Sequence, residues 1–215
     1  MKLLIYCAGG LGREYCDVAE RVNKQEHRWD EIAFIDDARA GDYYGKKTLT
    51  FADVCKLDRA DCEFLVANGN PSTREKLFDK MKAEGFKGAT VVDPNACVSP
   101  SATLKEGVLV SAHTLISSLS TLEENSLVLP CSVIGHDTVV GAHSFVCCDT
   151  AIGGNTKIGK RVYIGENAPV KENLTIGDDS IVSMGAVILR DVPESVIMFG
   201  NPARAMRNND DKKVF

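Results

Sequence analysis

The second half of the chain contains an uninterrupted six-residue repeat, and few folds accommodate such a pattern. From Val98 to Ile188, sixteen successive positions spaced six residues apart are Val, Ile or Leu. Glycine directly follows six of them, and the side chain four residues after most of them is Ala, Ser or Thr. A short fixed period of this kind predicts a solenoid in which every repeat has the same structure.

Each hexapeptide is expected to form one short strand and one corner. The aliphatic side chain then points to the axis, and the small side chain fits beside it. Three hexapeptides close one triangular coil, and successive coils stack through parallel backbone hydrogen bonds. We therefore predict an all-β parallel β-helix of hexapeptide repeats over residues 94–215, with a C-terminal tail after the last repeat.

The first 93 residues have a different pattern, which predicts a separate α/β domain over 1–93. Apolar runs favour strands, and amphipathic or Pro-initiated segments favour helices between them. Strand, helix and strand in alternation indicate βαβ units and a small parallel, Rossmann-like sheet. Strands are expected at 2–7, 31–37, 63–70 and 88–94, and helices at 13–24, 51–57 and 71–85.

Three carboxyl ends of these strands could bind a ligand, as in other open parallel sheets. They are the glycine-rich loop from Gly9 to Gly12, the pair Asp36 and Asp37, and the turn at Gly69. Glycines let backbone N–H groups approach a phosphate at a helix N-terminus. Cys7 stands where the first glycine of a dinucleotide-binding fingerprint would fall. A tight turn without ligand and a solvated strand end are therefore alternative interpretations.

Composition excludes several classes of protein. The chain is 44% hydrophobic and 26% charged with a net charge of −5, which is typical of a soluble globular protein and favours neither nucleic acid nor membrane as a partner. The N-terminus has no signal-peptide pattern, and no apolar stretch is long enough to span a bilayer. The eight cysteines include no CxxC pair. We expect a cytoplasmic protein with reduced cysteines and no zinc site.

Three histidines lie in the repeat, and one of them has an acidic neighbour. Counting around the coil places His113, His136 and His143 on three different sides, so within one chain they cannot converge on a metal. His136 is followed by Asp137, and a carboxylate can fix the tautomer of a histidine that acts as general base. The alternative interpretation of His136 is an exposed residue at a solvated corner.

The whole chain resembles one group of bacterial enzymes. The stretches that carry the resemblance span residues 5–206 and read YCAGGLGRE, FIDD, VANGN, VSPSA, SVIGHDTVVG, IGDDSIVSMGAV and GNPARAM. They are similar to sugar O- and N-acetyltransferases of the PglD and NeuD type. The resemblance implies a left-handed β-helix, a homotrimer with sites between neighbouring prisms, a nucleotide-sugar or sugar substrate, and acetyl-CoA as acyl donor.

The resemblance also assigns roles to particular residues. It implies that His136 is the general base and that Asp137 raises its basicity. The residues implied in nucleotide-sugar binding are Gly9, Gly10, Leu11, Asp36, Asp37 and Gly69. Those implied near acetyl-CoA are His143, Phe145, Glu166, Met184 and Gly185.

The chain departs from the family pattern at three positions. Cys7 replaces a glycine, Leu11 replaces a histidine, and Phe145 replaces a second histidine that can bond the thioester carbonyl. His143, two residues away from Phe145, is the candidate to substitute for that histidine.

The activity that the resemblance implies is metal-free, direct N-acetylation of a UDP-linked 4-amino-sugar by acetyl-CoA. The alternatives are O-acetylation of a sugar or sialic acid, a longer acyl donor, a metal-dependent hydratase on the same prism, and a non-catalytic trimeric scaffold or ligand sensor.

Overall fold

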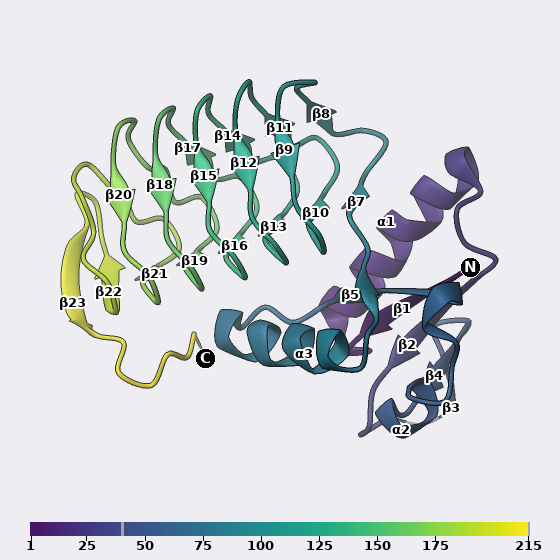
Figure 1. Ribbon diagram of the computed structural model, residues 1–215. Helices are drawn as coiled ribbons and strands as arrows, with labels where there is room; N and C mark the ends of the chain where they lie inside the picture. Colours follow the sequence, from purple (N-terminus) through teal and green to yellow (C-terminus); the bar gives the residue numbers. More distant parts are fainter. Residues whose placement is uncertain (40, 215) are drawn as a thin grey trace.

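The computed structural model describes residues 1–39 and 41–214 and consists of an α/β unit joined to a long triangular prism (Figure 1). The α/β unit contains a six-stranded sheet in the order β3-β4-β2-β1-β5-β6. All neighbours in it are parallel except β3 and β4, which confirms the predicted parallel sheet. The strands are β1 (Lys2–Tyr6), β2 (Glu31–Ile35), β3 (Gly41–Tyr43), β4 (Lys46–Leu49), β5 (Cys62–Val66) and β6 (Lys87–Gly88).

The hairpin β3–β4 was not expected from the sequence. Its strands are short and largely exposed, so they lack the apolar run or strict alternation that indicates a strand. The single strand predicted at 88–94 is replaced in the structure by two short strands, β6 and β7 (Val91–Val92). β6 ends the first sheet, whereas β7 already pairs with a strand of the prism. The chain thus joins the first face of the prism at β7, and the domain division at residues 93 and 94 stays a prediction.

Four helical segments accompany the sheet: α1 (Gly10–Glu26), α2 (Phe51–Val54), the 3₁₀ helix η1 (Arg59–Asp61) and α3 (Pro71–Ala83). α1 starts earlier than expected, inside the glycine-rich loop. A Cβ atom at Gly12 would lie 2.2 Å from the carbonyl oxygen of Cys7, so only glycine lets α1 approach the end of β1 this closely. α3 begins as its sequence predicts, with Pro71 in the first turn and the Asn70 side chain accepting a hydrogen bond from Thr73 N–H at 3.2 Å.

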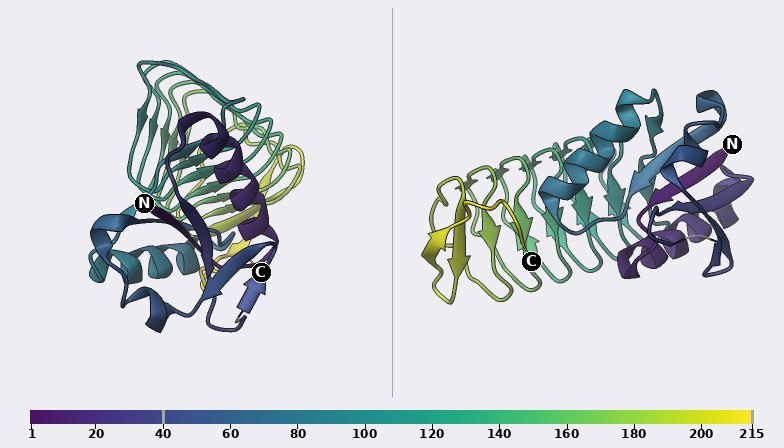
Figure 2. Two further views of the ribbon diagram at one scale, coloured as in Figure 1. Left: turned by 90° about the vertical axis from the view of Figure 1, so that its right-hand side faces the viewer. Right: turned by 90° about the horizontal axis from the view of Figure 1, so that it is seen from below.

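The second half of the chain is the predicted left-handed parallel β-helix, and Figure 2 shows its coils superposed as a triangle. The first face contains β7, β10 (Leu109–Val110), β13 (Leu127–Val128), β16 (Phe145–Val146), β19 (Tyr163–Ile164), β21 (Ile181–Val182), β22 (Val196–Phe199) and the antiparallel β23 (Arg204–Asn208). The second contains β8 (Cys97–Val98), β11 (Leu115–Ile116), β14 (Val133–Ile134) and β17 (Ala151–Ile152). The third contains β9 (Thr103–Leu104), β12 (Thr121–Leu122), β15 (Val139–Val140), β18 (Lys157–Ile158) and β20 (Thr175–Ile176).

The six-residue period has a direct structural cause in the corners. One corner residue in every six, from His113 to Asp179, has a positive φ of 52–62°, the left-handed conformation that Asn and Asp adopt more readily than most residues. The small polar side chains tie the coils together. Ser132 Oγ donates to the Cys147 carbonyl, and Ser144 Oγ donates to the Gly159 carbonyl, both at 2.8 Å in the next coil.

Part of the first face of the prism is covered by the α/β unit and is not exposed to solvent. Its outward side chains, including Leu127, Phe145 and Ile181, share one hydrophobic cluster with Tyr15 and Val18 of α1. The α/β unit therefore has part of its core on the prism, as the position of α1 and α3 against the coils indicates (Figures 1 and 2). Among residues 1–39 and 41–214, no helix has both the length and the hydropathy needed to cross a bilayer.

Candidate functional site

His136 and Asp137 form a hydrogen-bonded pair at the corner between β14 and β15. His136 Nδ1 lies 2.8 Å from Asp137 Oδ2, and the histidine side chain is 69% exposed. Asp137 occupies one of the left-handed corner positions, with φ 56°, which suits an aspartate. An ionised carboxylate only accepts, so Nδ1 carries the proton and Nε2 presents a lone pair to solvent. The pair has the geometry that a general base requires.

Gly154, in the next coil, lies directly beneath the imidazole ring. A Cβ atom placed on Gly154 would lie 2.6 Å from Nε2 and 2.8 Å from Cε1 of His136. These contacts are closer than carbon and nitrogen atoms approach without displacement. Glycine at this position is therefore what allows the ring to lie flat over the coil.

Gly154→Ala is expected to displace the imidazole and to lower the turnover that depends on it by about 10-fold or more, since a displacement near 1 Å has effects of this order. The fold should remain, because the nearest atoms to the added methyl belong to a side chain that can rotate. Activity and thermal midpoint measured on the same preparation check this. An unchanged turnover would show that the ring position over Gly154 does not matter.

A cleft lies between the α/β unit and the edge where the first and second faces of the prism meet. It has a volume of about 360 Å³, within the roughly 300–1,000 Å³ of small-molecule sites. The Phe145 and Tyr163 rings are stacked, with centroids 5.6 Å apart, and contribute to its floor. The residues around it are Gly10, Leu11, Glu14, Gly69, Leu129, Phe145, Cys147, Cys148, Tyr163 and Glu166.

Five residues predicted from the sequence thus lie around one cleft: Gly10, Leu11, Gly69, Phe145 and Glu166. Gly9 precedes Gly10 as the N-cap of α1, and a Cβ at Gly9 would meet no atom within 4 Å. The loop is therefore open toward a ligand.

Asp36 and Asp37 lie outside the cleft lining and make backbone contacts. Asp36 Oδ2 accepts from the Ala8 N–H at 3.0 Å, and Asp37 Oδ1 accepts from the Phe51 N–H at 2.7 Å. Asp36 thus links the segment before the glycine loop to the end of β2. Asp37 accepts a hydrogen bond from a backbone N–H at the start of α2 that has no partner within the helix. Their direct contact with a substrate stays a prediction.

Met184 and Gly185 lie one coil further along the same edge as Glu166. The Gly185 N–H donates to the Glu166 carbonyl at 2.8 Å, and the Met184 side chain is 67% exposed. The segment Gly200–Arg204 is close by, since Val187 hydrogen-bonds to both Gly200 and Ala203. The three predicted donor-side residues Glu166, Met184 and Gly185 therefore form a row along one edge of the prism.

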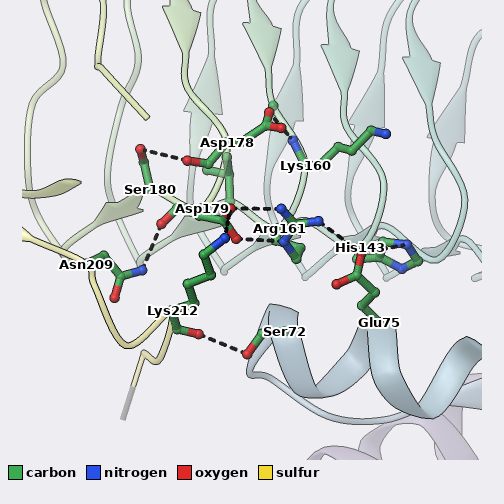
Figure 3. Close-up of polar contacts among 12 residues, drawn as sticks. Ser72, Glu75, His143, Lys160, Arg161, Asp178, Asp179, Ser180, Asn209 and Lys212 are labelled. Carbon is green, nitrogen blue, oxygen red and sulfur yellow. Dashed lines mark hydrogen bonds and ion pairs between the residues drawn. The ribbon is translucent and has the colours of Figure 1, made fainter. Parts of the chain in front are cut away.

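His143 lies elsewhere, in the junction between α3 and the prism. Only 5% of it is exposed, and its ring contacts Phe78 edge-on at 5.8 Å. Its Nδ1 lies 2.9 Å from Asn125 Nδ2, so the neutral ring accepts this hydrogen bond. Burial lowers the pKa of His143, partly opposed by Glu75, which reaches the ring from α3 (Figure 3). The structure gives His143 a contact role between domains, and its predicted place near acetyl-CoA stays untested.

The cleft and His136 lie on different edges of the same prism. The cleft residues Cys148 and Glu166 follow strands of the first face, whereas His136 follows β14 of the second. Within one chain the structure does not bring the base and the cleft together. In the part of the chain that is described, no group of three or more His, Cys, Asp or Glu side chains is arranged to hold a metal ion.

The sequence did not indicate five of the cleft residues: Glu14, Leu129, Cys147, Cys148 and Tyr163. Leu129 and Tyr163 belong to the repeat, where their positions follow only from knowing which face α1 covers. Glu14 stands in the first turns of α1, close to the glycine loop, and that proximity was the available signal.

Comparisons with known proteins agree with this architecture. Residues 2–81 match the model of the PglD N-terminal domain. A match to the Saccharomyces cerevisiae protein YJL218W has 38% identity over 39 residues, and this chain spans about a fifth (20%) of that protein.

Solved structures match over nearly the whole chain. The acetyltransferase domain of PglB from Neisseria gonorrhoeae, also solved with acetyl coenzyme A, has a TM-score of 0.90 and 29% identity, covering 95% of this chain and 99% of that one. Perosamine N-acetyltransferase from Caulobacter crescentus, solved with CoA and GDP-perosamine, has a TM-score of 0.90 and 27% identity, covering 97% and 98%. WeeI from Acinetobacter baumannii has a TM-score of 0.86 and 27% identity, covering 96% and 100%.

Proposed function

We propose that the chain is an acetyl-CoA-dependent sugar acetyltransferase of the hexapeptide-repeat class, and that its acceptor is the amine of a nucleotide-linked amino-sugar. The observation that carries the proposal is the cleft in which Gly10, Leu11 and Gly69 face the aromatic floor of the prism. Structural relatives solved with GDP-perosamine and with acetyl coenzyme A support it. A UDP-linked 4-amino-sugar is the acceptor we favour from the resemblance to PglD.

In the proposed reaction, His136 Nε2 accepts a proton from the sugar amine as the nitrogen attacks the thioester carbonyl carbon. The Asp137 carboxylate holds Nδ1–H and stabilises the imidazolium that forms. The C–S bond then breaks, and the leaving thiolate takes the proton from the imidazolium. The products are the N-acetylated sugar and CoA, and neither a covalent enzyme intermediate nor a metal takes part.

We further propose that the active unit is a homotrimer in which His136 of one copy meets the cleft of another. The second face lies between the His136 edge and the cleft edge, and it presents apolar side chains. Leu115 and Val133 are each 39% exposed on it. Covering this face with a second copy buries them and adjoins the two edges. The eight cysteines are all free, which supports the proposed cytoplasmic location.

The test is CoA thiol release from acetyl-CoA with a panel of UDP- and GDP-linked 4-amino-sugars and the corresponding 4-hydroxy sugars. We expect release with at least one amino-sugar and none with its hydroxyl counterpart. Activity confined to hydroxyl acceptors would instead establish an O-acetyltransferase. Tight binding of a nucleotide-sugar without any release would favour the sensor alternative.

A further inference from the structure

We propose that the segment 209–214 is a strap that holds the Gly69 turn of the cleft in the position that binds the nucleotide-sugar. Ser72 and Lys212 are then positioning residues, which act on the substrate through that turn. This inference rests on the proposed function and deepens it, because it names residues outside the cleft lining that determine acceptor affinity. Figure 1 shows this segment leaving β23 and running back to the start of α3.

The strap is fastened to the prism at Asp179, whose side chain is buried. Asn209, which is 4% exposed, donates from Nδ2 to the Asp179 carbonyl at 2.8 Å. Lys212 Nζ donates to Asp179 Oδ2 at 2.9 Å, and the Lys212 N–H donates to the Asn209 carbonyl at 3.1 Å. Further along, Val214 packs against the hydrophobic cluster that α1 shares with the first face. Polar and apolar contacts together give the segment a defined course.

The strap reaches the α/β unit at Ser72, in the first turn of α3 (Figure 3). Ser72 Oγ lies 2.9 Å from the Lys212 carbonyl oxygen and 2.8 Å from Asn70 Oδ1. Asn70 Oδ1 already accepts from the Thr73 N–H, so the single hydroxyl proton of Ser72 is available to Lys212. Among the described residues of the α/β unit, Ser72 is the one that forms a hydrogen bond with the strap. A change at Ser72 therefore releases the strap from α3 and leaves its contacts with the prism in place.

Two asparagines connect Ser72 to the turn in the cleft. Asn70 is the N-cap of α3, and its backbone N–H donates to Asn68 Oδ1 at 3.0 Å, which closes the turn around Gly69. Asn68 Nδ2 in turn lies 3.8 Å from the sulfur of Cys7, at the end of β1 where the glycine loop begins. Gly69 itself lines the cleft. A displacement of the first turn of α3 would therefore move the wall of the cleft.

The cleft has one wall from each unit, and the strap spans both units. Gly10, Leu11 and Gly69 belong to the α/β unit, whereas the aromatic floor belongs to the prism. Two residues beyond Ser72, Arg74 donates to Asn125 of the prism, so α3 stays docked when the strap is released. The strap adds the contact beside Gly69. A ligand that binds to a preformed site loses less free energy in ordering it, so the strap should raise the affinity for the acceptor.

The experiment compares Ser72→Ala and Lys212→Met with wild type on the 4-amino-sugar of the panel that wild type acetylates best. In each variant the KM for the acceptor should rise by about 3- to 10-fold, the factor that one hydrogen bond contributes to an equilibrium. The kcat and the KM for acetyl-CoA should keep their wild-type values. Ser72→Thr retains the hydroxyl and should restore the acceptor KM. Backbone amide exchange over residues 68–73 should be faster in Ser72→Ala and Lys212→Met, which reports the turn without turnover.

Lys213→Met is the matched control, since Lys213 is an exposed lysine of the same strap and makes no ion pair within the described part of the chain. A wild-type acceptor KM in both Ser72→Ala and Lys212→Met, on an amino-sugar that wild type acetylates, would overturn the strap and leave the proposed function intact. A parallel rise in the KM for acetyl-CoA or a fall in kcat would also overturn it, because the loss would then be a general structural one. Wild type that neither binds nor acetylates any nucleotide-linked amino-sugar would overturn the proposed function, and the role of the strap with it.

Discussion

His136→Ala should lower kcat for acetyl transfer by roughly 10²–10⁴-fold, the usual contribution of a general base. Because the imidazole acts on the proton of the attacking amine, its loss affects the chemical step. The KM values of acetyl-CoA and acceptor should change little. Steady-state thiol release at saturating acetyl-CoA measures the effect.

Two further variants separate this role from a structural one. Asp137→Asn keeps the shape of the corner but removes the charge that fixes the imidazole tautomer, so an intermediate loss is expected. His113→Ala alters an exposed histidine at another left-handed corner, with φ 58°, and should keep full activity. Equal activity of His136→Ala and His113→Ala would remove the base from the proposed mechanism.

Arg161→Met is expected to destabilise the folded protein by about 3 kcal/mol, because it leaves a buried carboxylate without its main partner. The Arg161 guanidinium binds both oxygens of Asp179, at 2.6 and 2.8 Å, and donates to Glu75 of α3 at 2.9 Å. The Asp179 side chain is only 6% exposed. Figure 3 shows that this cluster joins α3, the prism and the C-terminal segment, which contributes Asn209 and Lys212.

Urea unfolding at one protein concentration measures the change in free energy of unfolding. Lys160→Met is the control, since its side chain adjoins Arg161 in sequence and makes no ion pair in the described part of the chain. Acid provides a second readout. Burial raises the pKa of Asp179, but Arg161 and Lys212 more than offset it, so the pKa is lowered.

The stabilisation from this lowered pKa is present above the unfolded-state value near 3.9 and is lost as the pH falls through the folded-state value. In Arg161→Met, burial should prevail and acid unfolding should begin at higher pH. A variant with wild-type stability and an unchanged acid transition would contradict the role of this cluster.

The repeat was predictable because its cause is local. Each hexapeptide contains its own inward aliphatic residue, small neighbour and corner, so the period from Val98 to Ile188 specifies the prism without long-range information. The same holds for the strand-to-helix turn at Gly9–Gly12. The predicted pairing of His136 with Asp137 was equally local, because adjacent residues at one corner can meet without help from the rest of the fold.

The remaining features depend on contacts between distant segments. His143 resembles an exposed corner residue until α3 covers it, and no periodicity predicts which face a helix from another domain will cover. Glu14 and Glu166 are 152 positions apart, and they line one cleft only because α1 packs on the first face. The fully buried Arg74, which donates to the Val66 carbonyl and to Asn125 of the prism, is a similar case.

The stacking of coils also fixes distances along the axis of the prism. Hydrogen-bonded partners recur every 18 residues, and parallel strands lie about 4.8 Å apart, so each coil adds one fixed increment of length. α3 is fastened to particular coils through Asn125 and Arg161. Insertion of one 18-residue coil between Asn125 and His136 would therefore move His136 by one increment relative to the contact between Asn125 and Arg74 of α3. The number of coils between them therefore sets the distance along the prism from His136 to the contacts that α3 makes with it.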